Sequence, residues 1–155
     1  MAEQIYYEDV KVGDEITALA KIATTRTLVQ WAGAANDFNP LHFEEDFAKN
    51  MGVGAPIVHG ALKRAWLVNL MTEWVGENGT LKKLSCRYRA IDYPRKMKTW
   101  GMPKDGETWW CKGKVTQKYV KDEECCVECD IWVENGNGEK TTTGNATAVL
   151  PSKLK

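Results

Sequence analysis

The stretch PIVHGALKRAWLVNLMTEWVG, residues 56–76, is the longest helical candidate in the chain. Apolar side chains fill most of its positions and leave little polar surface. A helix that is apolar nearly all round belongs in a protein core, where other elements cover it. Gly76, Asn78 and Gly79 follow the last apolar positions and end the helix. The stretch therefore predicts one long buried helix on which the rest of the chain folds.

The sequence that follows this helix has the character of β-strands. Segments rich in alternating apolar and polar residues occupy residues 81–91, 109–120, 124–134 and 141–151. The run ENGNGEK between the last two contains Asn-Gly twice, which is a strong hairpin signal. One buried helix before four antiparallel strands predicts an α+β fold, with a curved sheet wrapped around the helix. At 155 residues the chain is expected to form one domain, residues 1–155.

The sequence before the helix predicts smaller elements. ITALAKIAT, residues 16–24, alternates loosely like a strand that completes the sheet. Thr24 and Thr25 offer a cap for a short helix in RTLVQWAGAAN, residues 26–36. EEDFAKN adds a further helical turn before glycines interrupt it. Several tryptophans are expected to be core aromatics, namely Trp31, Trp66, Trp74, Trp109 and Trp110.

Charge and hydropathy exclude several classes of protein. Lys plus Arg and Asp plus Glu both number 21, so the formal net charge is zero and a general nucleic-acid binder is not expected. The acidic start MAEQIYYEDVKVGDE does not resemble a secretory or mitochondrial leader. No apolar run has the length of a membrane span. We expect no membrane association and a cytoplasmic location.

The chain has five cysteines, and Cys126 and Cys129 form a CxxC. This spacing occurs in zinc and redox sites. The chain has no second CxxC or paired histidine cluster to complete a zinc site, and a strand would direct these two side chains to opposite faces. We therefore predict packed, reduced thiols and no metal.

Residues 36–42, NDFNPLH, contain the first candidate for catalysis. Pro40 lacks an N–H and moves Asn39 out of the helical region, so the chain must turn between Asp37 and His42. Such a turn can bring a carboxylate and an imidazole to one side, where they form an acid–base pair that holds a water. The alternative is ordinary turn chemistry, with no catalytic role for either residue.

The second histidine lies in APIVHGALK, just before the long helix. The amide of Gly60 would then be an unpaired donor at a helix N-terminus, where developing negative charge is stabilised. A glycine also lets a ligand approach the backbone closely. The alternative is that His59 is packed and Gly60 serves tight helix–sheet contact.

The stretch AANDFNPLHFEEDFAKNMGVGAPIVHGAL resembles the hydratase motif of MaoC-like proteins, which include the R-specific enoyl-CoA hydratases. The core of this resemblance is Asp37, Asn39, Pro40 and His42, and its second part is Ile57, His59 and Gly60. The order of elements agrees from about Tyr6 to Pro151. The resemblance implies a hot-dog fold that forms homodimers or higher homo-oligomers, with heterodimers as a further possibility.

The resemblance implies an enzyme that adds water reversibly to a trans-2-enoyl thioester of CoA or an acyl carrier, giving the R-3-hydroxyacyl thioester. Asp37 and His42 are then the catalytic pair, and the Gly60 N–H stabilises the thioester oxygen. The residues predicted to bind the substrate are Asn39, which also orients the motif, and His59. Lys63 and Arg64, at positions where many family members have small or apolar residues, are added as further candidates. No cofactor is expected beyond the CoA thioester itself.

Three points stay open at the level of sequence. Lys63 and Arg64 either contact an acidic substrate group or a CoA phosphate, or form a solvated shoulder of the helix. The basic loop of residues 94–107 either covers the nucleotide end of CoA or is a surface loop. The rival functions are a hot-dog thioesterase and one subunit of a heteromeric MaoC-like dehydratase.

Overall fold

The computed structural model describes residues 4–154. Its elements, in chain order, are η1 (Tyr7–Asp9), β1 (Glu15–Lys21), α1 (Thr25–Ala35), η2 (Pro40–His42), α2 (Glu45–Asn50), α3 (Gly60–Val75), β2 (Thr80–Tyr88), β3 (Trp109–Lys121), β4 (Glu124–Glu134) and β5 (Lys140–Val149).

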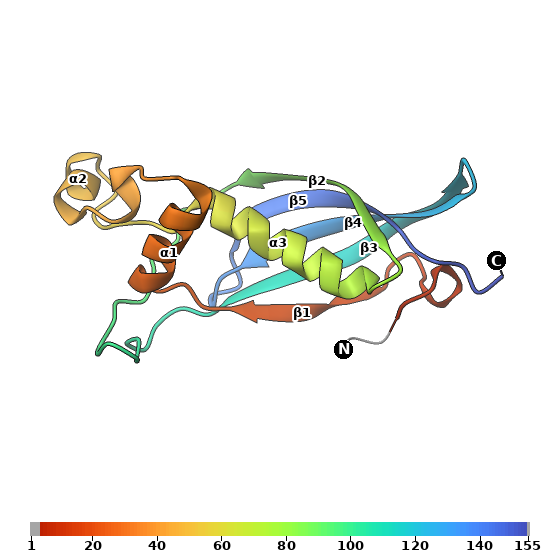
Figure 1. Cartoon of the computed structure of the whole chain (residues 1–155), viewed down its shortest axis with the longest axis horizontal. Coiled ribbons are helices and arrows are strands. Elements are labelled where there is room, and N and C mark those ends of the chain that lie inside the picture. Colours follow the sequence, from red (N-terminus) through yellow and green to blue (C-terminus); the bar gives the residue numbers. More distant parts are fainter. Residues whose placement is uncertain (1–3, 155) are drawn as a thin grey trace.

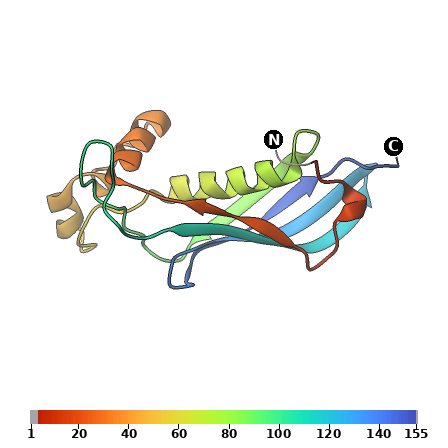
Figure 2. The ribbon, with the colours of Figure 1, turned by 90° about the horizontal axis from the view of Figure 1, so that it is seen from below.

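The five strands form one antiparallel sheet in the order β1-β3-β4-β5-β2. The sheet curves, and α3 lies along its concave face (Figures 1 and 2). At the N-terminal end of α3 lie α1, α2 and the loop between β2 and β3, while the two ends of the described chain lie toward its other end (Figure 1). The predicted α+β arrangement, a curved sheet around a long helix, is confirmed.

Helix α3 begins later than its sequence predicts. Residues 56–59 are not helical, and the helix runs from Gly60 to Val75. It ends at Gly76, whose φ of +73° is the backbone conformation that glycine adopts without strain. Its buried side faces the sheet with Leu67, Leu70 and Met71. The opposite side carries exposed Arg64, Thr72 and Glu73, so the helix is covered on one face rather than all round.

The core fills the space between α3 and the inner face of the sheet. Trp66 and Trp109 belong to it, with ring centroids 5.9 Å apart. Trp31 and Trp74 are partly buried against the same cluster. The prediction that Trp110 is a core residue is wrong, because it is 41% exposed. Neighbouring residues of a strand point to opposite faces, so burial of Trp109 directs Trp110 outward.

The hairpin between β4 and β5 is confirmed. Its turn contains Gly138, which has a φ of +81°. Cys126 and Cys129 are both buried and free, and only Cys129 belongs to the core cluster under α3. The two thiols of the CxxC are therefore packed on different sides of the sheet, as the strand pattern predicts.

Helix α1 leads into the functional region. The side-chain oxygen of Thr24 accepts from the backbone N–H of Thr27, and the Thr27 side chain accepts from the Thr24 N–H. This capping box fixes where the helix begins. Within residues 4–154, no helix has both the length and the hydrophobicity needed to cross a lipid bilayer.

Candidate active site

The loop that carries Asp37 begins with a tight exit from α1. Asn36 adopts the left-handed conformation, with a φ of +52°. The backbone N–H groups of Asn36 and Asp37 both donate to the carbonyl of Ala32, the second over 3.0 Å. The helix therefore ends at Ala35, and the half-buried Asp37 follows directly after the cap residue Asn36.

Asn39 shapes the next turn. Its Oδ1 accepts from the backbone N–H of Leu41 over 3.1 Å, and its carbonyl accepts from the N–H of His42 over 3.1 Å. Pro40 occupies the first position of η2, where no backbone donor is needed. The exposed Asn39 side chain is thus engaged in orienting the motif.

His42 is held in a defined orientation. Its Nδ1 lies 2.8 Å from the carbonyl oxygen of Ile57. A carbonyl only accepts, so Nδ1 carries the proton and donates. In the neutral ring, Nε2 is then left with its lone pair and can accept a proton. The bond also ties the loop of residues 37–42 to the segment that leads into α3.

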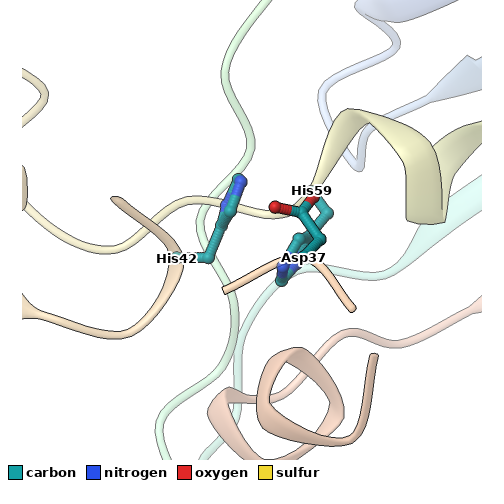
Figure 3. Close-up of side chains that lie close together, drawn as sticks. All are labelled: Asp37, His42 and His59. Atoms are coloured by element: carbon teal, nitrogen blue, oxygen red, sulfur yellow. The ribbon is translucent and has the colours of Figure 1, made fainter. Parts of the chain in front are cut away.

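His59 completes the cluster from the start of α3. Its ring stacks on that of His42 with centroids 3.6 Å apart and planes inclined by 20°. Figure 3 shows these two rings and the Asp37 carboxylate gathered beside the first turn of α3. His59 has no exposed surface, and neither ring nitrogen has a hydrogen-bond partner among the described residues. This position fits the alternative that His59 is a packed residue, because a ligand cannot reach its ring unless the surrounding residues move.

Burial sets the protonation of His59. Desolvation lowers the pKa of this imidazole below its ordinary 6.5, and the neighbouring His42 lowers it further. The Asp37 carboxylate acts in the opposite direction but is the smaller effect. His59 is therefore neutral near pH 7, and the stacked pair does not bring two positive charges together.

One atom each of Asp37, His42 and His59 lies within 4.8 Å of the others, a spacing that can hold a metal ion. Two imidazoles that share a tetrahedral ion point their nitrogens at it and splay apart. The rings here stack almost in parallel instead. A metal would require them to separate, so the arrangement fits an acid–base cluster better than a formed metal centre.

Gly60 is the first residue of α3, so its N–H has no acceptor within the helix. The position is crowded by Tyr88, the last residue of β2. A Cβ added to Gly60 would lie 2.7–2.9 Å from three carbons of the Tyr88 ring. A larger residue here would force the half-exposed Tyr88 ring to move, and Tyr88 forms the wall beside the predicted oxyanion donor.

The structure contradicts both predictions for Lys63, namely contact with an acidic group of the substrate or carrier and a place on a solvated shoulder of the helix. Its side chain is 3% exposed, and its Nζ lies 2.5 Å from Oδ2 of Asp92 and 3.0 Å from the carbonyl of Ala90. The ammonium is neither a solvated shoulder nor free to hold a substrate phosphate. Arg64, next along the helix, is exposed and remains a candidate for that role.

The basic loop of residues 94–107 is partly ordered by its own contacts. Arg95 donates to the carbonyl of Glu107 and to Oγ1 of Thr108, both over 2.8 Å, so its guanidinium is engaged within the loop. Lys98 is exposed, and Trp100 is 93% exposed. A role in covering CoA therefore stays a prediction, and the exposed Lys96, Lys98 and Trp100 are its candidates.

Sequence reasoning missed Tyr88 and Asp92. Tyr88 lies in a predicted strand and Asp92 just after it, and neither belongs to a recognisable motif. Both reach the site because β2 ends beside the first turn of α3 (Figure 1). The only available signal was the Lys63 position itself, because a lysine on the buried side of a helix needs a partner.

Comparison with known proteins finds a family model and a curated relative. The family model described as MaoC like domain matches residues 8–124. A curated (R)-specific enoyl-CoA hydratase from Rhodospirillum rubrum is 29% identical over 86 residues, which are 55% of this chain and 59% of that protein. The alignment thus spans under two thirds of the relative's length.

Solved structures share the fold of this chain. R-Hydratase PhaJ1 from Pseudomonas aeruginosa aligns with a TM-score of 0.80 and 20% identity, over 98% of this chain and 89% of the other. The ChsH1-ChsH2 complex from Mycobacterium tuberculosis aligns with a TM-score of 0.73 and 20% identity, over 91% of this chain and 98% of the matched chain. With a family model that covers most of its length and a hot-dog fold, this chain belongs to the MaoC-like domain family.

Proposed function

We propose that this protein is a hydratase that adds water reversibly to the double bond of a trans-2-enoyl thioester, giving the R-3-hydroxyacyl thioester. The observation that carries the proposal is the meeting of Asp37 and His42 beside the N-terminus of α3. A carboxylate oxygen of Asp37 and a ring nitrogen of His42 lie within 4.8 Å of each other. The similarity to an (R)-specific enoyl-CoA hydratase supports the same reaction.

The reaction follows from three groups. Asp37 and His42 hold one water above the β carbon, and the pair takes a proton from it as the oxygen bonds to that carbon. The π electrons of the double bond move through the α carbon to the thioester oxygen, where the Gly60 N–H stabilises the negative charge. The pair then returns a proton to the α carbon. The sum is the addition of one water, with no cofactor consumed.

The acyl group is carried by CoA or by an acyl-carrier protein. The exposed Arg64 on the first turns of α3 suits the phosphate groups that both carriers contain. Lys98 and Trp100 of the loop between β2 and β3 lie exposed and suit contact with the outer part of the carrier.

Assembly is part of the proposal. We expect a homodimer or a higher homo-oligomer, with a heterodimer as the second possibility because one structural neighbour is a complex of two different chains. The mass of the purified protein in solution distinguishes a homodimer from a monomer that needs a partner chain.

The experiment is a double assay on purified protein. Crotonyl-CoA and a longer trans-2-enoyl-CoA are supplied, and the loss of conjugated enoyl absorbance is followed while free thiol is titrated. Loss of absorbance without thiol release supports hydration, and chiral analysis of the product then tests for the R isomer. Release of free thiol would instead identify a thioesterase and overturn the proposal.

A further inference from the structure

The first turn of α3 contains a buried ion pair that the catalytic chemistry does not use. Lys63 and Asp92 are each 3% exposed by side chain, and their charged atoms lie 2.5 Å apart. Lys63 is one helical turn after Gly60, and Asp92 is in the connection that follows β2. The pair therefore joins the helix that carries the predicted oxyanion donor to the far side of the site.

Asp92 connects more than these two elements. Its Oδ1 accepts from Nε1 of Trp109, the first residue of β3, over 2.8 Å. Its backbone carbonyl accepts from the N–H of Val58 over 2.8 Å. One residue thus links the helix, the sheet and the strand-like segment that ends at Gly60.

Lys63 also contacts the segment that follows Tyr88. Its Nζ donates to the carbonyl of Ala90 over 3.0 Å, two residues after Tyr88. The same atom lies 6.0 Å from the centre of the Tyr88 ring, which occupies the space that a side chain at position 60 would need. The ammonium is therefore bonded just beyond the end of β2 and lies near the ring beside Gly60.

A buried ion pair is a poor way to gain stability, because desolvation of the charges offsets their attraction. Separating Lys63 from Asp92 would leave a buried charge unpaired, so arrangements that break this pair are disfavoured. An oxyanion donor needs a fixed position, because the stabilisation it gives to the transition state depends on its placement to within fractions of an ångström.

We propose that Lys63, through Asp92 and the carbonyl of Ala90, is a positioning residue that fixes the Gly60 amide and the Tyr88 ring for catalysis. This inference rests on the proposed hydratase function. Lys63 does not touch the substrate; it acts through the segment of residues 58–60 and through the end of β2.

The test compares three proteins with the wild type. The double variant Lys63→Met and Asp92→Asn removes both charges together, so neither is left buried and unpaired, and the introduced amide oxygen can still accept from Trp109. The single variant Lys63→Met leaves Asp92 unpaired. The matched control is Lys82→Met, which breaks the Lys82–Glu124 pair, of 2.6 Å and about half exposed, away from the site.

We expect kcat of the double variant to fall about 10- to 100-fold with KM within about twofold, because a misplaced transition-state donor leaves ground-state binding intact. Lys82→Met should leave both constants unchanged. A merely structural role predicts a lower Tm and an unchanged kcat per folded molecule. That result in the double variant would overturn the proposal.

A second readout does not depend on turnover. The Val58 amide donates to Asp92, so its hydrogen exchange in native protein reports whether the segment before Gly60 is held. We expect exchange at Val58 to accelerate at least about tenfold in the Lys63→Met protein and to stay at the wild-type rate in the control. If the wild type hydrates no enoyl thioester, the proposed function fails. Unchanged Val58 exchange would separately contradict the positioning role.

Discussion

His42 and His59 stack face to face, with ring centroids 3.6 Å apart, although 17 positions separate them in the sequence. His42 comes from the loop after α1, and His59 immediately precedes α3. The contact joins the two halves of the motif in one site. It also makes the charge of His59 important, because a protonated ring there would be buried and would face a second imidazole.

The first prediction concerns stability against pH. Burial lowers the pKa of His59 in the folded protein below its ordinary 6.5, so in acid the unfolded chain binds a proton that the folded chain resists. The free energy of unfolding should therefore fall as the pH drops below about 6.5. Above that value His59 is neutral in both the folded and the unfolded chain, so its titration should cause no loss of stability. Urea titrations between about pH 7.5 and 5.5 measure it.

The control for this prediction is His59→Asn, which removes the titrating ring and places a good helix cap before Gly60. Its free energy of unfolding should fall less steeply over the same pH range. Equal slopes for the variant and the wild type would mean that His59 contributes nothing to the acid sensitivity.

The second prediction concerns the contact between Gly60 and Tyr88. The methyl group of Gly60→Ala would lie under 3.0 Å from the Tyr88 ring, so the ring must move. We expect a cost of about 1–2 kcal/mol in stability with Tyr88 present and a much smaller cost in a Tyr88→Ala background. Chemical denaturation of the four proteins gives the coupling. The same cost in both backgrounds would show that the two residues do not constrain each other.

The third prediction concerns Arg64, which is exposed beside the site. If its guanidinium contacts a phosphate of the carrier, Arg64→Ala should raise KM for an enoyl-CoA by up to about fivefold, the effect of about 1 kcal/mol at an exposed ion pair. KM for the corresponding N-acetylcysteamine thioester, which has no phosphate, should not change. A similar rise for both substrates would exclude a phosphate contact.

The fourth prediction concerns the thiols. Burial raises the pKa of Cys111 and of Cys129 to about 12, and it raises the pKa of Cys126 as well. Cys86 is half-buried, and the other four cysteines are buried. A disulfide reagent at about pH 8 should therefore modify one thiol at most in the native protein and all five after denaturation. Rapid native modification at Cys126 and Cys129 would revive a redox interpretation of the CxxC.

The fold was largely predictable because its signals are local. Alternating strands, the Asn-Gly turn and Gly76 after the long helix all act through near neighbours, and β4 has the bounds that its pattern predicts. The beginning of α3 was placed too early, because nothing in the apolar pattern distinguishes the extended residues 56–59 from a first helical turn. Trp110 was misplaced because hydrophobicity alone does not say which of two adjacent tryptophans faces the core.

The site was predictable only in part. Pro40 between Asp37 and His42 requires a turn, and a turn brings neighbours together. The contacts that complete the site join residues far apart in the chain. The partner of Lys63 lies 29 residues away, and the wall over Gly60 comes from the end of a strand. Such contacts depend on how α3 packs against the sheet, and the hydrophobic periodicity of the sequence does not predict this packing.

The catalytic pair itself is tested by steady-state hydration of a trans-2-enoyl-CoA by the wild type, Asp37→Asn and His42→Ala. The control is Asp46→Asn, an exposed carboxylate in the first turn of α2. General acid–base catalysis is worth about 10²–10⁴ in rate, so kcat should fall by at least about 100-fold in each catalytic variant while all four proteins stay folded. The control should match the wild type. Hydration that persists within about tenfold of the wild-type rate in either Asp37→Asn or His42→Ala would contradict the assignment of the reaction to this pair.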